Sequence, residues 1–137
     1  MMAGSQAVNE LKSRLSAVGI TYSVENFTAV ADPLLEQISL MIDSIDDQSV
    51  IQAAIMWALD SGDCPAGGEV VRYFAHRYQW PWLKEEVERK RADRRSVRDL
   101  RGERVYEWVL EAFDDDWDDA DFYPSLQTGG RASNGSG

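Results

Sequence analysis

Apolar residues recur at helical spacing along most of the chain. A stripe at i, i+3, i+7, i+10 predicts an amphipathic helix over residues 5–18, which Gly19 is expected to end. We expect residues 20–31 to form an ordered connector. Similar apolar patterns predict further helices over residues 32–45, 48–61, 66–79 and 80–113.

The helices predicted at 32–45 and 48–61 are separated by only a short polar turn. Asp32 suits an N-cap, and Pro33 suits the first helical position that follows it. So short a connection favours an antiparallel helical hairpin over residues 32–61. The second helix is apolar on most sides, which predicts that it is central and buried.

This pattern resembles one HEAT-type repeat, a unit of about 40 residues. The resemblance is carried by Asp32-Pro33 at the first helix start, Asp46-Asp47 in the turn and Ala53-Ala54 on the second helix. The Arg that usually follows the Val of the second helix in that family is absent, because Ile51 follows Val50. The resemblance implies a stacked helical hairpin, and a compact bundle fits the length of the chain equally well.

The stretch 80–113 is helical in composition but contains one expected break. Ser96 and Asp99 have the spacing of a capping box, so a new helix is expected to begin near Ser96. Its buried stripe is predicted to consist of Val105, Trp108, Val109 and Ala112. In a continuous helix one face would carry Arg91, Arg94, Arg98 and Arg101, with Arg95 beside them. This face has two readings: a solvated face with i,i+4 ion pairs, or a face that holds an anion or an acidic segment.

Taken together, the patterns predict an all-α protein, a compact bundle of five to six helices. The length of 137 residues is that of one domain, which we place at residues 1–127. Residues 128–137 are rich in Gly and Ser and are predicted to be a disordered tail. The chain has one cysteine and no apolar run of transmembrane length, so we expect a cytoplasmic protein without a membrane partner.

Charge is unevenly distributed along the chain. The net charge is −10, with −6 in residues 1–80, +2 in residues 81–110 and −6 in residues 111–137. Nucleic acid is therefore not expected as a partner, because phosphates require a basic footprint. A basic protein partner is favoured instead.

The chain lacks a recognisable catalytic constellation. His76 is the only histidine, Cys64 the only cysteine, and neither belongs to a nucleophile–base or zinc-binding motif. The glycines before residue 69 are not followed by the Lys of a phosphate-binding loop. We therefore expect no enzyme activity, no cofactor and no metal.

The main indication of function is a run of aspartates after the last predicted helix. Six of the eight residues 114–121 are Asp, at a helix end where the macrodipole disfavours negative charge. A calcium loop fits poorly, because Asp119 stands where an EF-hand requires Gly. A solvated tail is a second reading, although aromatic residues interleave the acids. A third is an acidic surface for a basic protein, and a fourth is pairing with the arginine face within one molecule.

For the acidic-surface reading, Trp117 and Tyr123 are the expected hot spots, since these residue types dominate interface energetics. The full set of candidate partner-binding residues is Glu111, Asp114, Asp115, Asp116, Trp117, Asp118, Asp119, Asp121, Phe122 and Tyr123.

In size, charge and its Asp/Trp cluster, the chain resembles a bacterial immunity protein, the class of antitoxins that neutralise basic toxins such as nucleases. The resemblance implies stoichiometric occlusion of a toxin-like partner by residues 111–123. Two alternatives stay open: a helical adaptor that binds a peptide or partner helix through residues 32–61, and a DNA-mimicking inhibitor of a nucleic-acid-binding protein. The sequence also leaves open the identity of the partner and the oligomeric state.

Overall fold

The computed structural model describes residues 4–25 and 28–126. Within this part of the chain the fold is all-α, as predicted, and no strand occurs. The elements are α1 (Gly4–Glu25), α2 (Thr28–Asp43), α3 (Gln48–Asp60), α4 (Gly67–Tyr78), α5 (Pro81–Ser96), α6 (Leu100–Glu111) and the short 3-10 helix η1 (Asp118–Phe122). The predicted tail at 128–137 lies outside the described residues.

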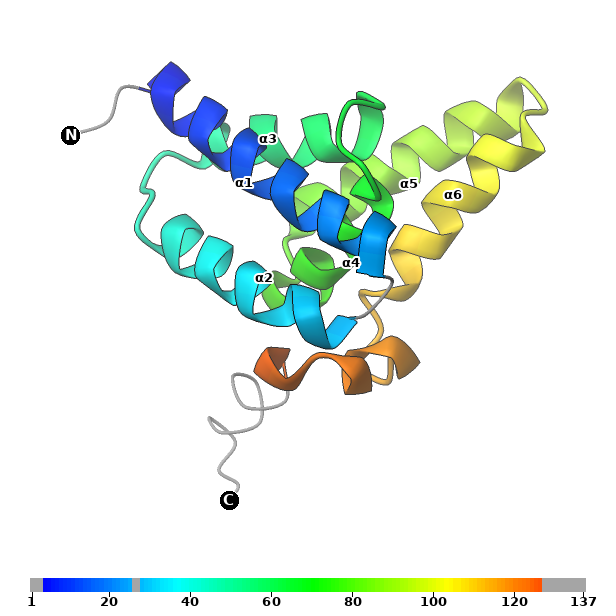
Figure 1. The fold of residues 1–137 in the computed structure, drawn as a ribbon. Coiled ribbons are helices and arrows are strands. Elements are labelled where there is room, and N and C mark those ends of the chain that lie inside the picture. Colours follow the sequence, from blue (N-terminus) through cyan, green and yellow to red (C-terminus); the bar gives the residue numbers. More distant parts are fainter. Residues whose placement is uncertain (1–3, 26–27, 127–137) are drawn as a thin grey trace.

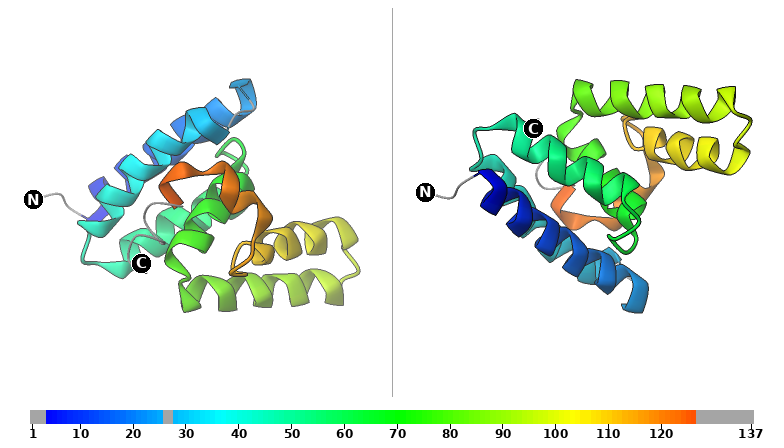
Figure 2. Two further views of the ribbon diagram at one scale, coloured as in Figure 1. Left: turned by 90° about the horizontal axis from the view of Figure 1, so that it is seen from below. Right: turned by 90° about the horizontal axis from the view of Figure 1, so that it is seen from above.

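The helices are arranged around α1 and α4. Helix α1 packs against α2 and α3, while α4 packs against α1, α2, α3 and α6 (Figure 1). Val70, Tyr73 and Phe74 of α4 are fully buried, so this helix forms the centre of the core. Helices α5 and α6 run side by side and project from the remaining helices, as both views in Figure 2 show.

The first helix is longer than predicted and does not end at glycine. Helix α1 continues through Gly19 to Glu25, so the expected connector at 20–31 is wrong. The buried positions Leu15, Val18 and Tyr22 continue one helical stripe past the glycine. Gly19 serves close packing instead, because a Cβ there would lie 1.8 Å from the carbonyl oxygen of Pro65.

The predicted hairpin over residues 32–61 is also wrong in its packing. Helix α2 begins at Thr28, so that Pro33 lies inside the helix. Helices α2 and α3 each pack mainly against α1, not as a pair on each other, because their apolar stripes face that helix. The HEAT-type resemblance therefore does not extend to the packing. The turn itself behaves as expected, since Asp47 caps α3 by accepting a hydrogen bond from the Ser49 amide at 3.0 Å.

The break between α5 and α6 lies close to its predicted position. Arg98 adopts a positive φ of 59°, and Asp99, not Ser96, caps α6 by accepting from the Gly102 amide at 2.9 Å. Val105, predicted to be buried, is 43% exposed, whereas Val109 is fully buried. The reason is that only the C-terminal half of α6 reaches the core, while its N-terminal half lies in the projecting part.

Replacing Gly19 by alanine is expected to lower the free energy of unfolding by about 2 kcal/mol, because the new methyl group must displace backbone. Gly62→Ala is the matched control, because a Cβ at that position would meet nothing within 4 Å and only the φ of 79° opposes a side chain. That strain costs about 1 kcal/mol. Urea unfolding of both variants measures the loss in the free energy of unfolding that each substitution causes. A smaller loss at Gly19 than at Gly62 would contradict the close approach of α1 to the loop at Pro65.

Candidate acidic surface

The chain after α6 folds into consecutive tight turns. Backbone amides of Trp117, Ala120 and Tyr123 each donate to the carbonyl three residues earlier, at 3.1–3.2 Å. Side chains three residues apart lie on one side of such a chain. Trp117, Ala120, Tyr123 and Leu126 therefore form one buried row, each at most 8% exposed. Of the acids between them, Asp118 and Asp121 are exposed and Asp119 is half-buried.

Hydroxyl groups join this segment to three helices. The hydroxyls of Tyr123 and Tyr22 are hydrogen-bonded, which links the segment to α1. The Ser125 hydroxyl lies 2.7 Å from that of Tyr73 in α4 and donates to the Asp32 carboxylate of α2 at 2.6 Å. Burial raises the pKa of Tyr123 to about 12 and the pKa of Tyr22 further above its ordinary value, so both phenols remain neutral. Asp32, predicted as an N-cap, is thus a buried anchor for the C-terminal segment.

Arg72 of α4 supplies the positive charge beneath the acids. Its guanidinium carbon lies 4.1 Å from the ring centroid of Trp108 and 4.9 Å from that of Trp117. It donates to Asp119 at 3.2 Å and to Glu111 at 3.4 Å, although the residue is only 4% exposed. A planar guanidinium suits this position, because it can stack on indole rings and bind carboxylates at its edge.

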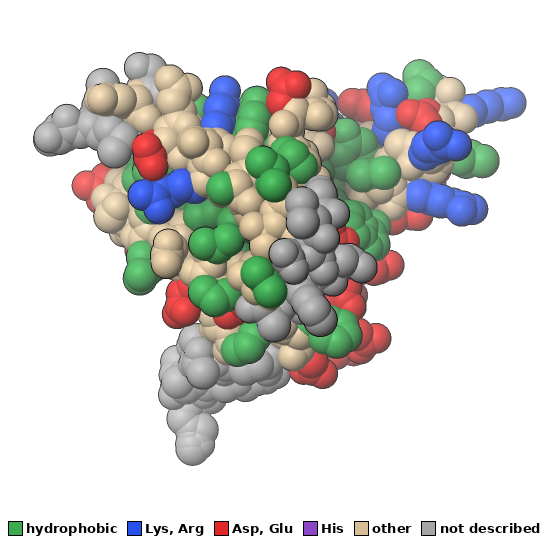
Figure 3. Space-filling view, in the orientation of Figure 1, with side chains coloured by type: hydrophobic (Ala, Val, Ile, Leu, Met, Phe, Trp, Pro, Cys, Tyr) green, Lys and Arg blue, Asp and Glu red, His purple; other side chains and the backbone are tan. Residues whose placement is uncertain are grey.

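The remaining acids are left without such a partner. Within residues 4–25 and 28–126, no ion pair forms at Asp114, Asp115, Asp116, Asp118 or Asp121, and all five are exposed. A hollow of about 460 Å³ is lined by Arg72, Trp108, Glu111, Asp114, Asp116, Trp117, Asp118 and Asp119. In Figure 3 acidic side chains gather at the lower right of the molecule and basic ones at the far right. We call Glu111 and the six aspartates of 114–121 the acidic surface.

Burial changes the roles predicted for the aromatic residues. Trp117 is 7% exposed and Tyr123 is 2% exposed, so neither is available as the predicted contact with a partner. Their rings pack inside the protein. The ring centroids of Trp117 and His76 are 5.2 Å apart, and those of Trp117 and Tyr123 are 6.1 Å apart. Phe122, by contrast, is 60% exposed, and it is the aromatic side chain that a partner can reach.

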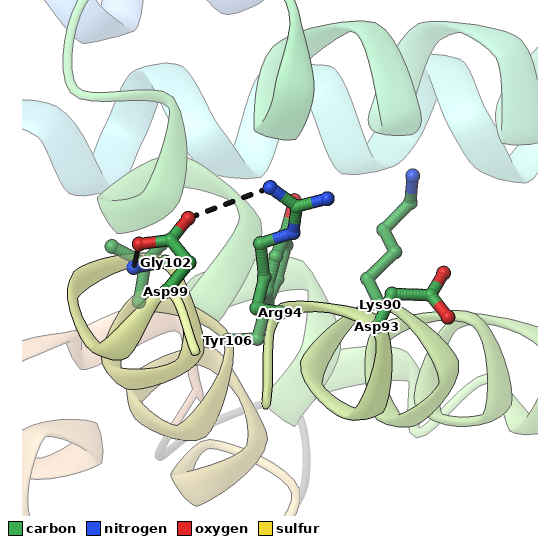
Figure 4. Close-up of a pocket in the computed structure, with 7 residues that line it drawn as sticks. Lys90, Asp93, Arg94, Asp99, Gly102 and Tyr106 are labelled. Atoms are coloured by element: carbon green, nitrogen blue, oxygen red, sulfur yellow. Dashed lines mark hydrogen bonds and ion pairs between the residues drawn. The ribbon is translucent and has the colours of Figure 1, made fainter. Parts of the chain in front are cut away.

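The predicted arginine face is divided by the break before α6. Its arginines pair with acids of the α5–α6 unit: Arg91 with Glu107 at 3.9 Å, Arg94 with Asp99 at 3.4 Å and Arg95 with Glu103 at 2.7 Å. Arg94 and Asp99 both line a hollow of about 360 Å³, where the Arg94 side chain reaches the Asp99 carboxylate (Figure 4). Arg98 lies within the break and Arg101 lies beyond it, so neither continues the row. The arginine that meets the acidic segment is Arg72, which the sequence pattern did not single out, although a lone charge within an apolar helical run was a signal.

His76 and Cys64 are the only histidine and the only cysteine of the chain, and both pack within the fold. His76 Nδ1 lies 2.8 Å from the carbonyl oxygen of Ala112, and its ring packs on Trp117. Cys64 is buried, and this burial raises its thiol pKa to about 11. In the described part of the chain, no three His, Cys, Asp or Glu residues are grouped so as to hold a metal ion.

Comparisons with protein-family models, with curated proteins and with solved structures found no match to this chain. Among the described helices, none combines the length and the apolar character needed to cross a membrane.

Replacing Glu69 by glutamine is expected to stabilise the protein at neutral pH. Glu69 is half-buried in the first turn of α4, and burial raises its pKa despite the opposing charge of Arg72. An acid with a raised folded-state pKa lowers stability as pH rises above its ordinary value of about 4.3. The gain at neutral pH should be less than about 1 kcal/mol, because the carboxylate remains partly in water. Urea midpoints that still differ below about pH 3, well under the ordinary pKa of a glutamate, would contradict this origin.

Proposed function

We propose that this protein is a non-catalytic inhibitor that binds a basic protein partner through its acidic surface. The observation that carries the proposal is the exposure of Asp114, Asp115, Asp116 and Asp118 on a segment that the buried Trp117 and Tyr123 hold against the helices. Like charges so close together oppose folding, and the described residues provide only Arg72 against them. A local feature that works against stability is expected where it serves function.

The anchoring of the segment gives these carboxylates a benefit in binding. A partner that meets an already ordered surface does not bear the entropy cost of ordering it. Opposite charge on the partner would also steer the encounter and raise the association rate. Phe122, beside the acids and largely exposed, would add apolar contact.

Within this class, we infer an immunity protein that occludes a toxin-like partner with a basic active site, such as a nuclease. The support is the combination of a net charge of −10, a helical fold and a compact acidic surface. The adaptor alternative has less support, because α2 and α3 pack on α1 and do not form the expected paired hairpin. Carboxylates that mimic DNA would have to follow one face at phosphate spacing, whereas these lie within one short segment.

The test compares two variants with the same change in net charge. The first carries Asp→Asn at positions 114, 115, 116 and 118. The control carries Glu36→Gln, Asp46→Asn, Asp63→Asn and Glu88→Gln, four exposed acids located elsewhere. The full-length wild type and both variants are used to capture proteins from the source cells, and the captured protein is then assayed with each.

The proposal expects the wild type and the control to bind one basic protein and to inhibit it at a ratio of one to one. The first variant should bind with a lower association rate and a weaker salt dependence. Equal binding and inhibition by all three proteins would contradict the role of the acidic surface.

A further inference from the structure

One face of α6 changes the sign of its charge along its length, and its C-terminal half borders Arg72 of α4. Arg101, Arg104, Trp108 and Glu111 follow the spacing i, i+3, i+7, i+10, which places them on one helical face. The face opposite to it contains the buried residues Glu103 and Val109. Arg98 precedes this row at the basic end and Asp114 follows it at the acidic end, both exposed.

Two hollows meet on this face at Trp108. One, of about 560 Å³, is lined by Leu100, Arg101, Arg104, Val105 and Trp108. The other is the acidic hollow, which Trp108 also lines. Leu100 is 66% exposed and Val105 is 43% exposed, so the basic half of the face also presents apolar surface.

A two-fold rotation would place the basic end of this face against the acidic end of the same face on a second copy. Arg101 and Glu111 each lie five residues from Tyr106, about 7.5 Å along the axis at 1.5 Å per residue. Arg98 and Asp114 each lie eight residues from it in the sequence. A second copy placed antiparallel on this face would therefore set Arg101 opposite Glu111, twice. It would also bring Arg98, which lies just before α6, toward Asp114, which lies just after it, at each end of the contact.

We propose that this face of α6 docks a second copy of the chain, forming a two-fold symmetric dimer. Such an interface uses the same patch on both copies, which requires the self-complementarity seen here. A partner of one charge sign would match only half of the face, whereas a second copy matches both halves. Trp108 and Val105 lie near the axis, where apolar contact would accompany the charge pairs.

The net charge of the chain limits the strength of this dimer. Two copies of net charge −10 repel each other at long range. Residues 90–104 contain seven bases and three acids, a local charge of +4 that favours contact. At about 0.15 M salt the Debye length is about 8 Å, so distant repulsion is screened while pairs in contact remain. The dimer should therefore be weak and form at physiological ionic strength.

This inference does not rest on the proposed function. Dimerisation needs no other protein, and it would be observed whether or not a basic partner exists. The two are connected only because Glu111 and Asp114 belong to both surfaces, so a bound partner and a second copy would compete.

The experiment is sedimentation velocity of the full chain at about 10 µM and about 500 µM protein, a range that brackets weak association. At about 0.15 M salt we expect the average mass to rise toward twice the monomer mass, and to fall again at about 1 M salt, where the Debye length is about 3 Å. A monomer mass at every concentration would overturn the proposal.

Charge reversal identifies the interface. Arg98→Asp and Asp114→Arg should each raise the dimer dissociation constant by about tenfold or more, since each creates two like-charge contacts. The double variant should restore the wild-type constant, because a two-fold axis brings the exchanged charges opposite each other again. Lys84→Asp and Asp63→Arg, exposed sites away from this face, are the matched controls and should leave the constant within about twofold. A double variant as weak as either single variant, with unchanged helical content by circular dichroism, would overturn the two-fold arrangement.

Discussion

Replacing Trp117 by alanine is expected to lower the free energy of unfolding by about 3–5 kcal/mol, the range for truncating a buried aromatic residue. The indole is 7% exposed and packs against Arg72, His76 and Tyr123. Its removal would leave a cavity between α4 and the acidic segment. Urea unfolding followed by circular dichroism measures the loss.

The same substitution should also weaken binding to a basic partner, although Trp117 does not face one. Without the indole, the carboxylates on either side of it would lose their fixed positions, and a partner would have to order them. Phe122→Ala is the informative control, because Phe122 is 60% exposed. It should alter stability by less than about 0.5 kcal/mol and still raise the dissociation rate. If Trp117→Ala lowered the free energy of unfolding by less than Phe122→Ala does, the anchoring role of Trp117 would be wrong.

The helices that can be predicted from this sequence are those whose signals are local. The helices expected at 48–61 and 66–79 agree within one residue with α3 and α4, because apolar periodicity and flanking turn residues coincide there. Gly19 and Pro33 suggest helix boundaries because glycine and proline break helices in isolation. Both lie inside helices. Gly19 is required by contact with a loop more than 40 residues away, and no local pattern reports such a contact.

The sequence identifies the acidic segment as the candidate site, but it assigns Trp117 and Tyr123 to the exposed side, whereas both are buried. The acids at 114–121 are identified by composition, and five of the six are exposed as expected of an acidic surface. The period of three shared by Trp117, Ala120 and Tyr123 is present in the sequence and indicates which side chains are buried. Arg72 could not be assigned to the segment, because its pairs with Glu111 and Asp119 join residues 39 and 47 positions apart.

Replacing Arg72 by alanine is expected to lower the free energy of unfolding by about 3 kcal/mol, through the loss of two desolvated cation–π contacts and two charge-assisted hydrogen bonds. Arg72→Met keeps most of the packing between Trp108 and Trp117 but not the charge. Arg72→Lys keeps the charge but not the planar group that stacks on both rings. Both should fall between the wild type and the alanine variant.

The salt dependence of stability separates the contribution of the Arg72 charge from the contribution of its packing. Without Arg72, Glu111 and Asp119 join the acids that lack a counter-charge, and this repulsion is screened at about 1 M salt. The loss of packing is not screened. The methionine variant should therefore recover most of its lost stability in high salt, whereas the alanine variant should recover only part. Equal recovery by both variants would mean that the two indole rings do not need Arg72 between them, and that its role is charge alone. A methionine variant that recovered nothing would instead show that repulsion among the acids contributes little to stability, which would weaken the argument that their clustering serves binding.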